Sequence, residues 1–157
     1  MRIVTLTGAK NSGTDKIASL LSENSDVGYI RPYTDKNIPF GEIAELYGDY
    51  HHVAPEVLDQ MIEDEEVLSI NYVNGTRYVF FKFQLEYDYN ILIADDYTVV
   101  NIKTNYDDVY SVMVHSKDEK PSNRVGVYLY EHEFDEVFNY DTDDIDSLEW
   151  RIGFEFD

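Results

Sequence analysis

The beginning of the chain constrains the fold most, because a short apolar run leads directly into a loop bounded by two glycines. Residues 2–7 (Arg-Ile-Val-Thr-Leu-Thr) are typical of a buried strand, and a helical pattern begins after the second glycine. The spacing between them is that of the phosphate-binding loop G-x-x-x-x-G-K-[ST], but Thr14 replaces the lysine and Asp15 replaces the metal-binding hydroxyl residue. The strand, loop and helix predict an α/β fold. The two replacements argue against phosphoryl transfer by this loop. The candidate loop residues are Gly8, Asn11, Ser12, Gly13, Thr14 and Asp15.

Composition places the chain among globular proteins. Its 157 residues suffice for one domain with a hydrophobic core, and 43% of them are hydrophobic. No run approaches the roughly 18 apolar residues of a membrane span, and the first residues lack a signal-peptide pattern. Because the chain has no cysteine, disulfides and thiolate metal sites are excluded. We expect a cytoplasmic protein.

The formal net charge of −20 restricts the partners that the chain can bind. Such a surface repels nucleic acid and anionic membranes, so we expect neither as a partner. Two interpretations of the acidity stay open. It serves solubility, or it forms a face that binds a basic protein, in one version by imitating DNA with carboxylate runs such as 63–66 and 141–146.

Apolar periodicity divides the chain into alternating helices and strands, which predicts an α/β fold with a parallel sheet core. The segment 27–54 is rich in Gly, Pro, Tyr and Asp and is predicted to be irregular. Asn74-Gly75 indicates a hairpin that lies beside the core as a small insertion. Strands are predicted at 2–7, 66–73, 77–83, 90–94, 109–114 and 134–139, and helices at 14–23, from 54 onward, and at 142–150 with Asp143 or Asp144 as cap. The apolar faces predicted for the first two helices are Ile17, Leu20 and Leu21, and Val57, Leu58, Met61 and Ile62.

Several blocks of the chain together resemble guanylate kinase, a nucleoside monophosphate kinase with a phosphate-binding loop. They occur in the order and spacing of that family and cover nearly the whole chain. Besides the loop, they are Gly28-Tyr29-Ile30-Arg31-Pro32, Gly48-Asp49-Tyr50-His51-His52-Val53, Asn74-Gly75-Thr76-Arg77-Tyr78, Ile91-Leu92-Ile93-Ala94-Asp95 and the late strand 134–141.

The resemblance implies a single domain with a core (1–30 and 84–157), a small β-rich monophosphate-binding arm (about 31–83) and a reduced lid. Carried over by position, Arg31 and Tyr50 would hold a monophosphate and Tyr78 would assist. The alternative is that Tyr50 and Tyr78 pack the arm. Asp95 would take the family's acidic position, although the adjacent pair Asp95-Asp96 also suits a solvated turn.

The departures from the family concentrate where the chemistry would occur. Phosphoryl transfer requires positive charge around the transferred group, and Thr14 supplies none. Asp15 suits a helix cap better than a metal ligand and would oppose an anion. Lys10 and Lys16 are candidate substitutes for the lysine, and Arg124 is the candidate lid cation. The family's second arm arginine, base-recognising acid and following hydroxyl fall near Thr34, Tyr72 and Phe80, so guanine selectivity is not supported.

The four histidines do not form a convincing metal set, and we expect each to be a lone surface residue. His51 and His52 are neighbours whose side chains would point to opposite faces of a strand. No metal site is predicted.

Three functions follow from these observations. The first is a catalytically inactive guanylate kinase-like protein that binds another protein through the arm. The second is an active nucleoside monophosphate kinase, of viral type with an altered base, that uses ATP and Mg²⁺ and acts on GMP or a related monophosphate. The third is a sensor that binds a nucleotide without turnover.

Overall fold

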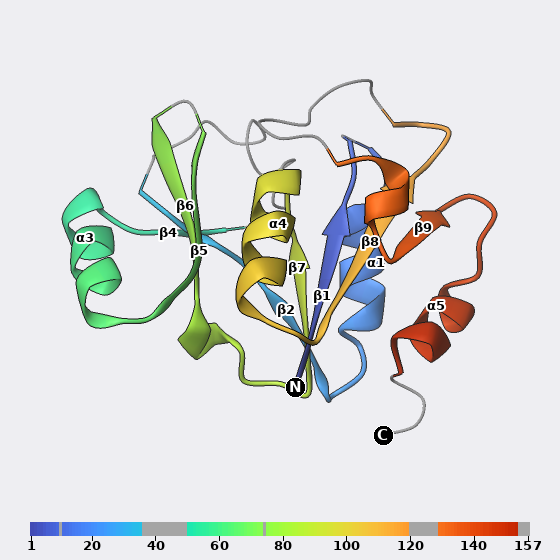
Figure 1. Ribbon diagram of the computed structural model, residues 1–157, viewed down its shortest axis with the longest axis horizontal. Helices are drawn as coiled ribbons and strands as arrows, with labels where there is room; N and C mark the ends of the chain where they lie inside the picture. Colours follow the sequence, from blue (N-terminus) through green and yellow to red (C-terminus); the bar gives the residue numbers. More distant parts are fainter. Residues whose placement is uncertain (10, 36–49, 74, 120–128, 154–157) are drawn as a thin grey trace.

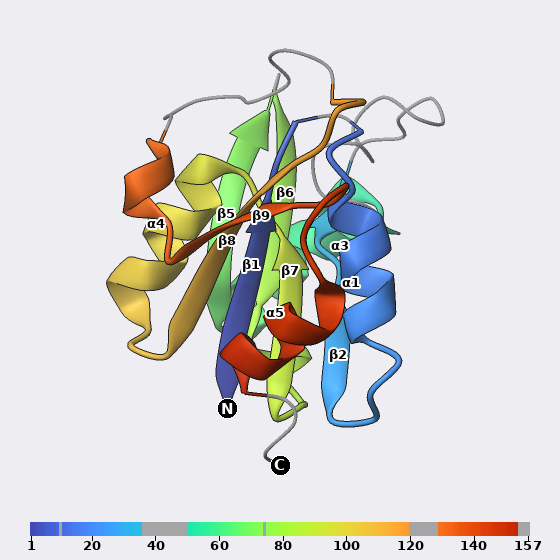
Figure 2. The same ribbon diagram turned by 90° about the vertical axis from the view of Figure 1, so that its right-hand side faces the viewer.

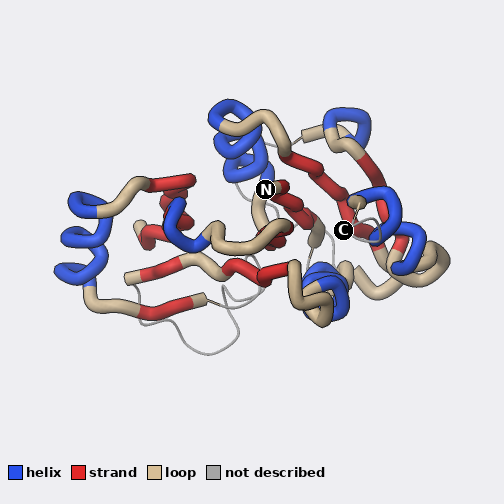
Figure 3. Tube along the Cα trace, turned by 90° about the horizontal axis from the view of Figure 1, so that it is seen from below, coloured by secondary structure: helices blue, strands red, loops and turns tan. Residues whose placement is uncertain are grey.

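The computed structural model describes residues 1–9, 11–35, 50–73, 75–119 and 129–153. They form two sheets side by side, a five-stranded core sheet and a four-stranded arm sheet (Figures 1 and 3). The core strands are β1 (Arg2–Thr7), β2 (Val27–Ile30), β7 (Tyr89–Ile93), β8 (Val109–His115) and β9 (Glu136–Asn139). The arm strands are β3 (Tyr33–Thr34), β4 (His51–His52), β5 (Val67–Val73) and β6 (Thr76–Phe81). The helices are α1 (Thr14–Leu21), α3 (Pro55–Asp64), α4 (Asp96–Asn105) and α5 (Ile145–Ile152), with short 3₁₀ turns η1 (Lys82–Gln84) and η2 (Glu131–Glu133).

All pairings in the core sheet are parallel, in the order β2-β7-β1-β8-β9. The central strand β1 pairs with β7 and β8, and five of its six residues are buried. A parallel sheet is covered on both faces, which explains its continuous apolar runs. The predicted α/β class with a parallel core is therefore confirmed.

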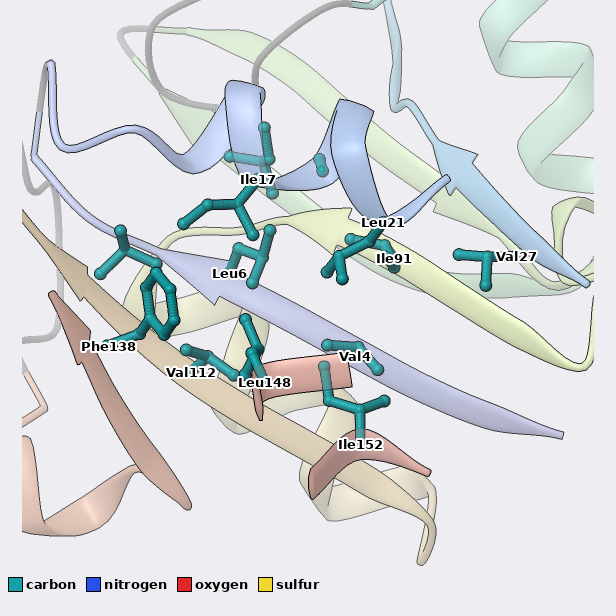
Figure 4. Packing of buried hydrophobic residues seen from close by; sticks show 13 residues of the cluster. Val4, Leu6, Ile17, Leu21, Val27, Ile91, Val112, Phe138, Leu148 and Ile152 are labelled. Atoms are coloured by element: carbon teal, nitrogen blue, oxygen red, sulfur yellow. The ribbon is translucent and has the colours of Figure 1, made fainter. Parts of the chain in front are cut away.

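Helices α1 and α5 cover one face of the core sheet, and α4 covers the other (Figure 2). On the first face, Ile17 and Leu21 of α1 and Leu148 and Ile152 of α5 pack against alternate residues of the strands, including Phe138 of β9 (Figure 4). Leu20 is 42% exposed, so its predicted place in the stripe of α1 is wrong. The helix ends at Leu21, two residues before the predicted end.

Two core elements differ from the sequence predictions. The start of the segment 27–54 contains β2, an edge strand in place of irregular structure. Its Gly28 indicates close packing, since a Cβ there would lie 2.0 Å from the ring of Tyr87. Helix α4 was not predicted, because its β-branched and Asn-rich sequence has low helix propensity. Packing of Val99 and Ile102 against the sheet stabilises it.

Local signals placed the last helix correctly. Asp144 is the N-cap of α5, and its carboxylate accepts a hydrogen bond from the Asp146 amide at 3.1 Å. Gly153 ends the helix in the left-handed conformation, at φ 104°. The helix begins at Ile145, three residues later than predicted.

The arm sheet has the order β4-β3-β6-β5, and α3 packs against it. β5 and β6 form the predicted antiparallel hairpin, with Gly75 at φ 79°; Asn74 lies outside the described residues. Pro55 occupies the first turn of α3 as predicted. Leu58 is its fully buried residue, whereas Val57 is 48% exposed and does not belong to the buried face. None of the described helices has the length and apolar character needed to cross a bilayer.

Candidate functional site

The candidate loop lies at the carboxyl edge of the core sheet, between β1 and α1. This edge also receives the segments that follow β7, β8 and β9, and it is where parallel α/β sheets bind ligands. Asn11 and Gly13 adopt left-handed backbone conformations, with φ of 63° and 103°. The hydroxyl of Ser116, just after β8, donates to the Asn11 carbonyl at 2.6 Å. The loop backbone is therefore folded back on itself and tied to the neighbouring strand.

Glycine is required at both ends of this loop. A Cβ on Gly8 would lie 2.3 Å from Oγ of Ser12, which is buried beneath the loop. A Cβ on Gly13 would lie 2.8 Å from the ring of Tyr140, which covers the loop from the end of β9. The sequence motif located these glycines, but it gave no sign of the contact with Tyr140.

The charges around the loop do not suit an anion. A pocket of about 640 Å³ opens beside the loop, and the charged groups that the described residues contribute to its lining are three carboxylates and two ammonium groups. Thr14 is 8% exposed. The N-cap of α1 is Gly13, so Asp15 is not the cap but stands in the first turn, where its charge favours the helix dipole. The charged lining residues are Asp15, Lys16, Lys117, Asp118 and Glu119.

Of the two lysines proposed as substitutes, the structure describes Lys16. Nζ of Lys16 lies 5.7 Å from the centroid of the Tyr140 ring, a distance suited to a cation–π contact. Lys10 and Arg124 lie outside the described residues. Lys117, which follows Ser116, was not considered from the sequence and lines the same pocket.

The candidate monophosphate residues gather where the arm joins the core. Arg31 follows β2 directly, and its guanidinium lies 4.3 Å from the centroid of the Tyr29 ring. Tyr50 is partly exposed and precedes β4. Tyr78, on β6, is 1% exposed and faces Thr34 across the sheet. Burial raises the pKa of Tyr78 to about 12, and Tyr50 and Asp35 add to this shift. Tyr78 therefore packs as a neutral phenol in the hydrophobic cluster between the arm and the core.

Arg77, next to Tyr78, is a further arm cation that sequence reasoning did not assign to the site. Its Nε lies 2.7 Å from Oδ2 of Asp35, and its Nη1 lies 2.5 Å from Oδ1 of Asp59. Its third group, Nη2, donates to the carbonyl of Pro55 at 3.2 Å. All three partners are distant in sequence, so no local signal pointed to them. Arg77 joins β6, the end of β3 and α3 within the arm.

The adjacent acids after β7 are not a solvated turn. Asp95 and Asp96 are 3% and 1% exposed. The Asp95 carboxylate accepts hydrogen bonds from the Asn71 amide of β5 at 2.7 Å and from the Thr98 hydroxyl. Asp96 accepts one from the Leu129 backbone amide. Asp95 therefore connects the arm sheet to the core, which agrees with a structural position at their junction.

The histidines are less isolated than predicted. The ring of His115 lies between two carboxylates, with Nδ1 3.0 Å from Glu119 and Nε2 2.9 Å from Glu131. His51 packs on Tyr33, with ring centroids 4.8 Å apart, and His132 stacks on Tyr130. The prediction of lone surface histidines is therefore wrong for these three. Within the described ranges, no three such side chains are arranged to hold a metal ion.

Comparison with known proteins identifies the architecture. The sequence matches no protein-family model and no curated protein. The structure resembles the crystal structure of guanylate kinase from Anaplasma phagocytophilum with a TM-score of 0.64. The match covers 98% of this chain and 83% of that one. The chain has a guanylate kinase-like fold. At 18% sequence identity the likeness establishes the fold alone, and the chemistry has to be argued from the residues present.

Proposed function

We propose that this guanylate kinase-like protein is catalytically inactive and acts by binding a basic protein partner. The observation that carries the proposal is the charge of the loop pocket. Kinases of this architecture neutralise the transferred phosphate with lysine, arginine and Mg²⁺. Here Thr14 stands at the lysine position, Asp15 stands at the start of the helix, and carboxylates outnumber ammonium groups among the described residues of the lining.

The arm supports the same proposal. Arg77 is engaged by Asp35 and Asp59, and Tyr78 is buried. A monophosphate would have to compete with two carboxylates for the guanidinium of Arg77. The most direct candidate for a phosphate contact in the arm is then Arg31. One guanidinium group would have to hold the phosphate against the net charge of −20.

The surface charge favours a partner of opposite sign. Long-range attraction raises the association rate of complementary surfaces and weakens as salt is added. A basic protein meets this condition, and one version of the proposal is an acidic inhibitor that occupies a DNA-binding surface. The binding affinity is expected to fall steeply with salt.

One observation favours a second function, an active nucleoside monophosphate kinase that uses ATP and Mg²⁺. The loop has two left-handed residues and an anchor to Ser116, a backbone conformation of the kind that presents amides to a phosphate, although the Ser12 amide donates to the Ala9 carbonyl at 3.1 Å. Lys16 and Lys117 would then have to replace the missing lysine.

A turnover assay separates the two functions. The protein is incubated with ATP, Mg²⁺ and, in turn, GMP, dGMP, dUMP and dTMP. We expect no diphosphate above the level of a sample without protein. Turnover that the substitution Arg31→Ala abolishes would overturn the proposal and establish the kinase with the arm site as assigned. Turnover that survives Arg31→Ala would overturn both the proposal and the site assignment.

A further inference from the structure

Helix α3 lies at the outer end of the arm, far from the core sheet (Figure 1). Of its ten residues, Leu58 is the one that is fully buried, against Val79 and Phe81. Val57 is 48% exposed, and Met61 lies one turn further along the same face. Met61 is partly buried against the arm, so within the described residues the helix exposes a short apolar stripe made of Val57 and part of Met61.

This stripe forms the floor of a groove of about 360 Å³. Val57 and Met61 supply its apolar surface, and Gln60 lies between them. Glu56, Asp64 and Glu65 supply three carboxylates around it. We call these six residues the α3 groove. An apolar floor with a rim of one charge is suited to a ligand of the opposite charge that carries an apolar side chain.

The rim charges are not neutralised by the described part of the arm. Arg77 pairs with Asp35 and Asp59, and Lys82 pairs with Glu66 at 2.9 Å. Within the described residues, no lysine or arginine pairs with a carboxylate of the α3 groove. As far as the described residues extend, the groove therefore keeps the negative charge of its carboxylates, of which Asp64 accepts a hydrogen bond from the Gln60 side-chain amide at 2.9 Å.

We propose that the α3 groove docks a short basic segment of a partner protein, with an aliphatic side chain of that segment inserted between Val57 and Met61. This rests on the proposed function and names the surface that carries it. Lysine or arginine residues on both sides of the aliphatic side chain would meet the rim carboxylates. A nucleic acid or an anionic membrane is repelled by this rim, and a second copy of the chain carries the same charge of −20.

The test uses a synthetic probe, a lysine-rich helical peptide with two leucines four residues apart. A matched peptide carries serine in place of both leucines. Backbone amide shifts of the full chain are followed by NMR during titration. We expect shifts concentrated on α3 with the leucine peptide, and weak shifts scattered over the acidic surface with the serine peptide. Equal scatter with both peptides, or no binding, would overturn the proposal.

Two pairs of variants separate the apolar contact from the charge. Val57→Ser is expected to lower the affinity for the leucine peptide roughly tenfold. Val137→Ser, at a valine that is 42% exposed on β9, should leave this affinity unchanged. Glu56→Gln combined with Asp64→Asn should reduce affinity mainly at low salt, and Asp107→Asn, an exposed acid on the core, serves as control. Equal effects of a variant and its control would contradict the docking site.

The outcomes distinguish this proposal from the one on which it rests. If the protein is inert in the turnover assay and the shifts avoid α3, the docking surface is wrong while the inactive binding protein stands. If turnover is found and the peptide still shifts α3, the proposed function fails and the groove stands. Dimerisation through α3, detected by sedimentation, would replace the basic partner by a second copy.

Discussion

The core sheet and the outer part of the arm differ in how many of their residues are buried. Each helix on the core sheet buries at least two residues against it, and the central strand is almost wholly buried. The arm has two longer strands, β5 and β6, whose buried residues pack against the core, while its outer part consists of two strands of two residues each and of α3, in which Leu58 is the fully buried residue. The core is therefore supported by helices packed on both faces, whereas the outer part of the arm buries few residues and exposes more of its surface.

The same contrast holds within the candidate site. The loop backbone is fixed by glycines and by Ser116, while Thr14 and Asp15 at the start of the helix supply no positive charge for a phosphate. Backbone geometry follows from the fold, but a charged side chain at the mouth of a pocket contributes little to it. A loop with Thr14 at this position is therefore compatible with the architecture.

The largest expected effect tests the core side of this comparison. Phe138 is 2% exposed and packs among the residues of α1, β8 and α5. We expect Phe138→Ala to lower the free energy of unfolding by about 3–5 kcal/mol, because it leaves a cavity in close-packed surroundings. Chemical denaturation measures it. A loss below about 1 kcal/mol would show that the core is not the main support of the fold.

The next effect tests the connection between the two regions. Asp95→Ala removes the acceptor for Asn71 of the arm and for Thr98 of α4. We expect a loss of about 2–3 kcal/mol, since hydrogen bonds to a buried carboxylate are stronger than neutral ones. Hydrogen exchange of β5 should accelerate more than that of β1. Unchanged exchange in β5 would contradict a role for Asp95 at the junction, and Asp107→Asn is the control.

A smaller effect appears only at alkaline pH. Burial raises the pKa of Tyr78 to about 12, above the value of about 10 for an unfolded chain. The folded arm favours the neutral phenol, so this contribution is complete below pH about 10 and is lost as the pH rises through about 12. Tyr78→Phe should make stability less dependent on pH in that window. An unaltered alkaline profile, measured beside Tyr110→Phe in the core, would contradict the burial of Tyr78.

The smallest expected effect tests whether an exposed residue of the arm contributes to stability. Val57→Ser should change the free energy of unfolding by no more than about 0.5 kcal/mol, because this side chain is 48% exposed and lies on the outer face of α3. Thermal or chemical denaturation suffices for the measurement. A loss of 2 kcal/mol or more would mean that Val57 supports the arm and is not free for a partner.

The sequence predicted those parts of the molecule whose cause is local. The strand and glycine loop, the buried runs of β7 and β8, and the Asp144 cap each depend on a few neighbouring residues. Helix α4 was missed because packing on the sheet, and not its own propensity, makes it helical. The sequence does not predict the strand at the start of 27–54, because glycine is typical of loops and the close packing of Tyr87 on Gly28 is a tertiary contact.

The site was less predictable than the fold, since its contacts join residues far apart in the chain. Burial of Asp95 depends on Asn71 in a different sheet, and the pairing of Arg77 depends on Asp35, 42 positions away. The carboxylates that line the loop pocket come from α1 and from the segment after β8. The motif gave the position of the loop, but only the structure gave its electrostatic surroundings.

The most direct test of the account is calorimetric titration of the protein with ATP and Mg²⁺, beside the double variant Thr14→Lys, Asp15→Ser. We expect no measurable binding to the original protein and a gain of binding in the variant, because the loop backbone is formed and the two substitutions supply the charge and the hydroxyl that it lacks. If ATP binds the original protein and the variant equally well, the proposal of an inactive protein is wrong and an active kinase is favoured.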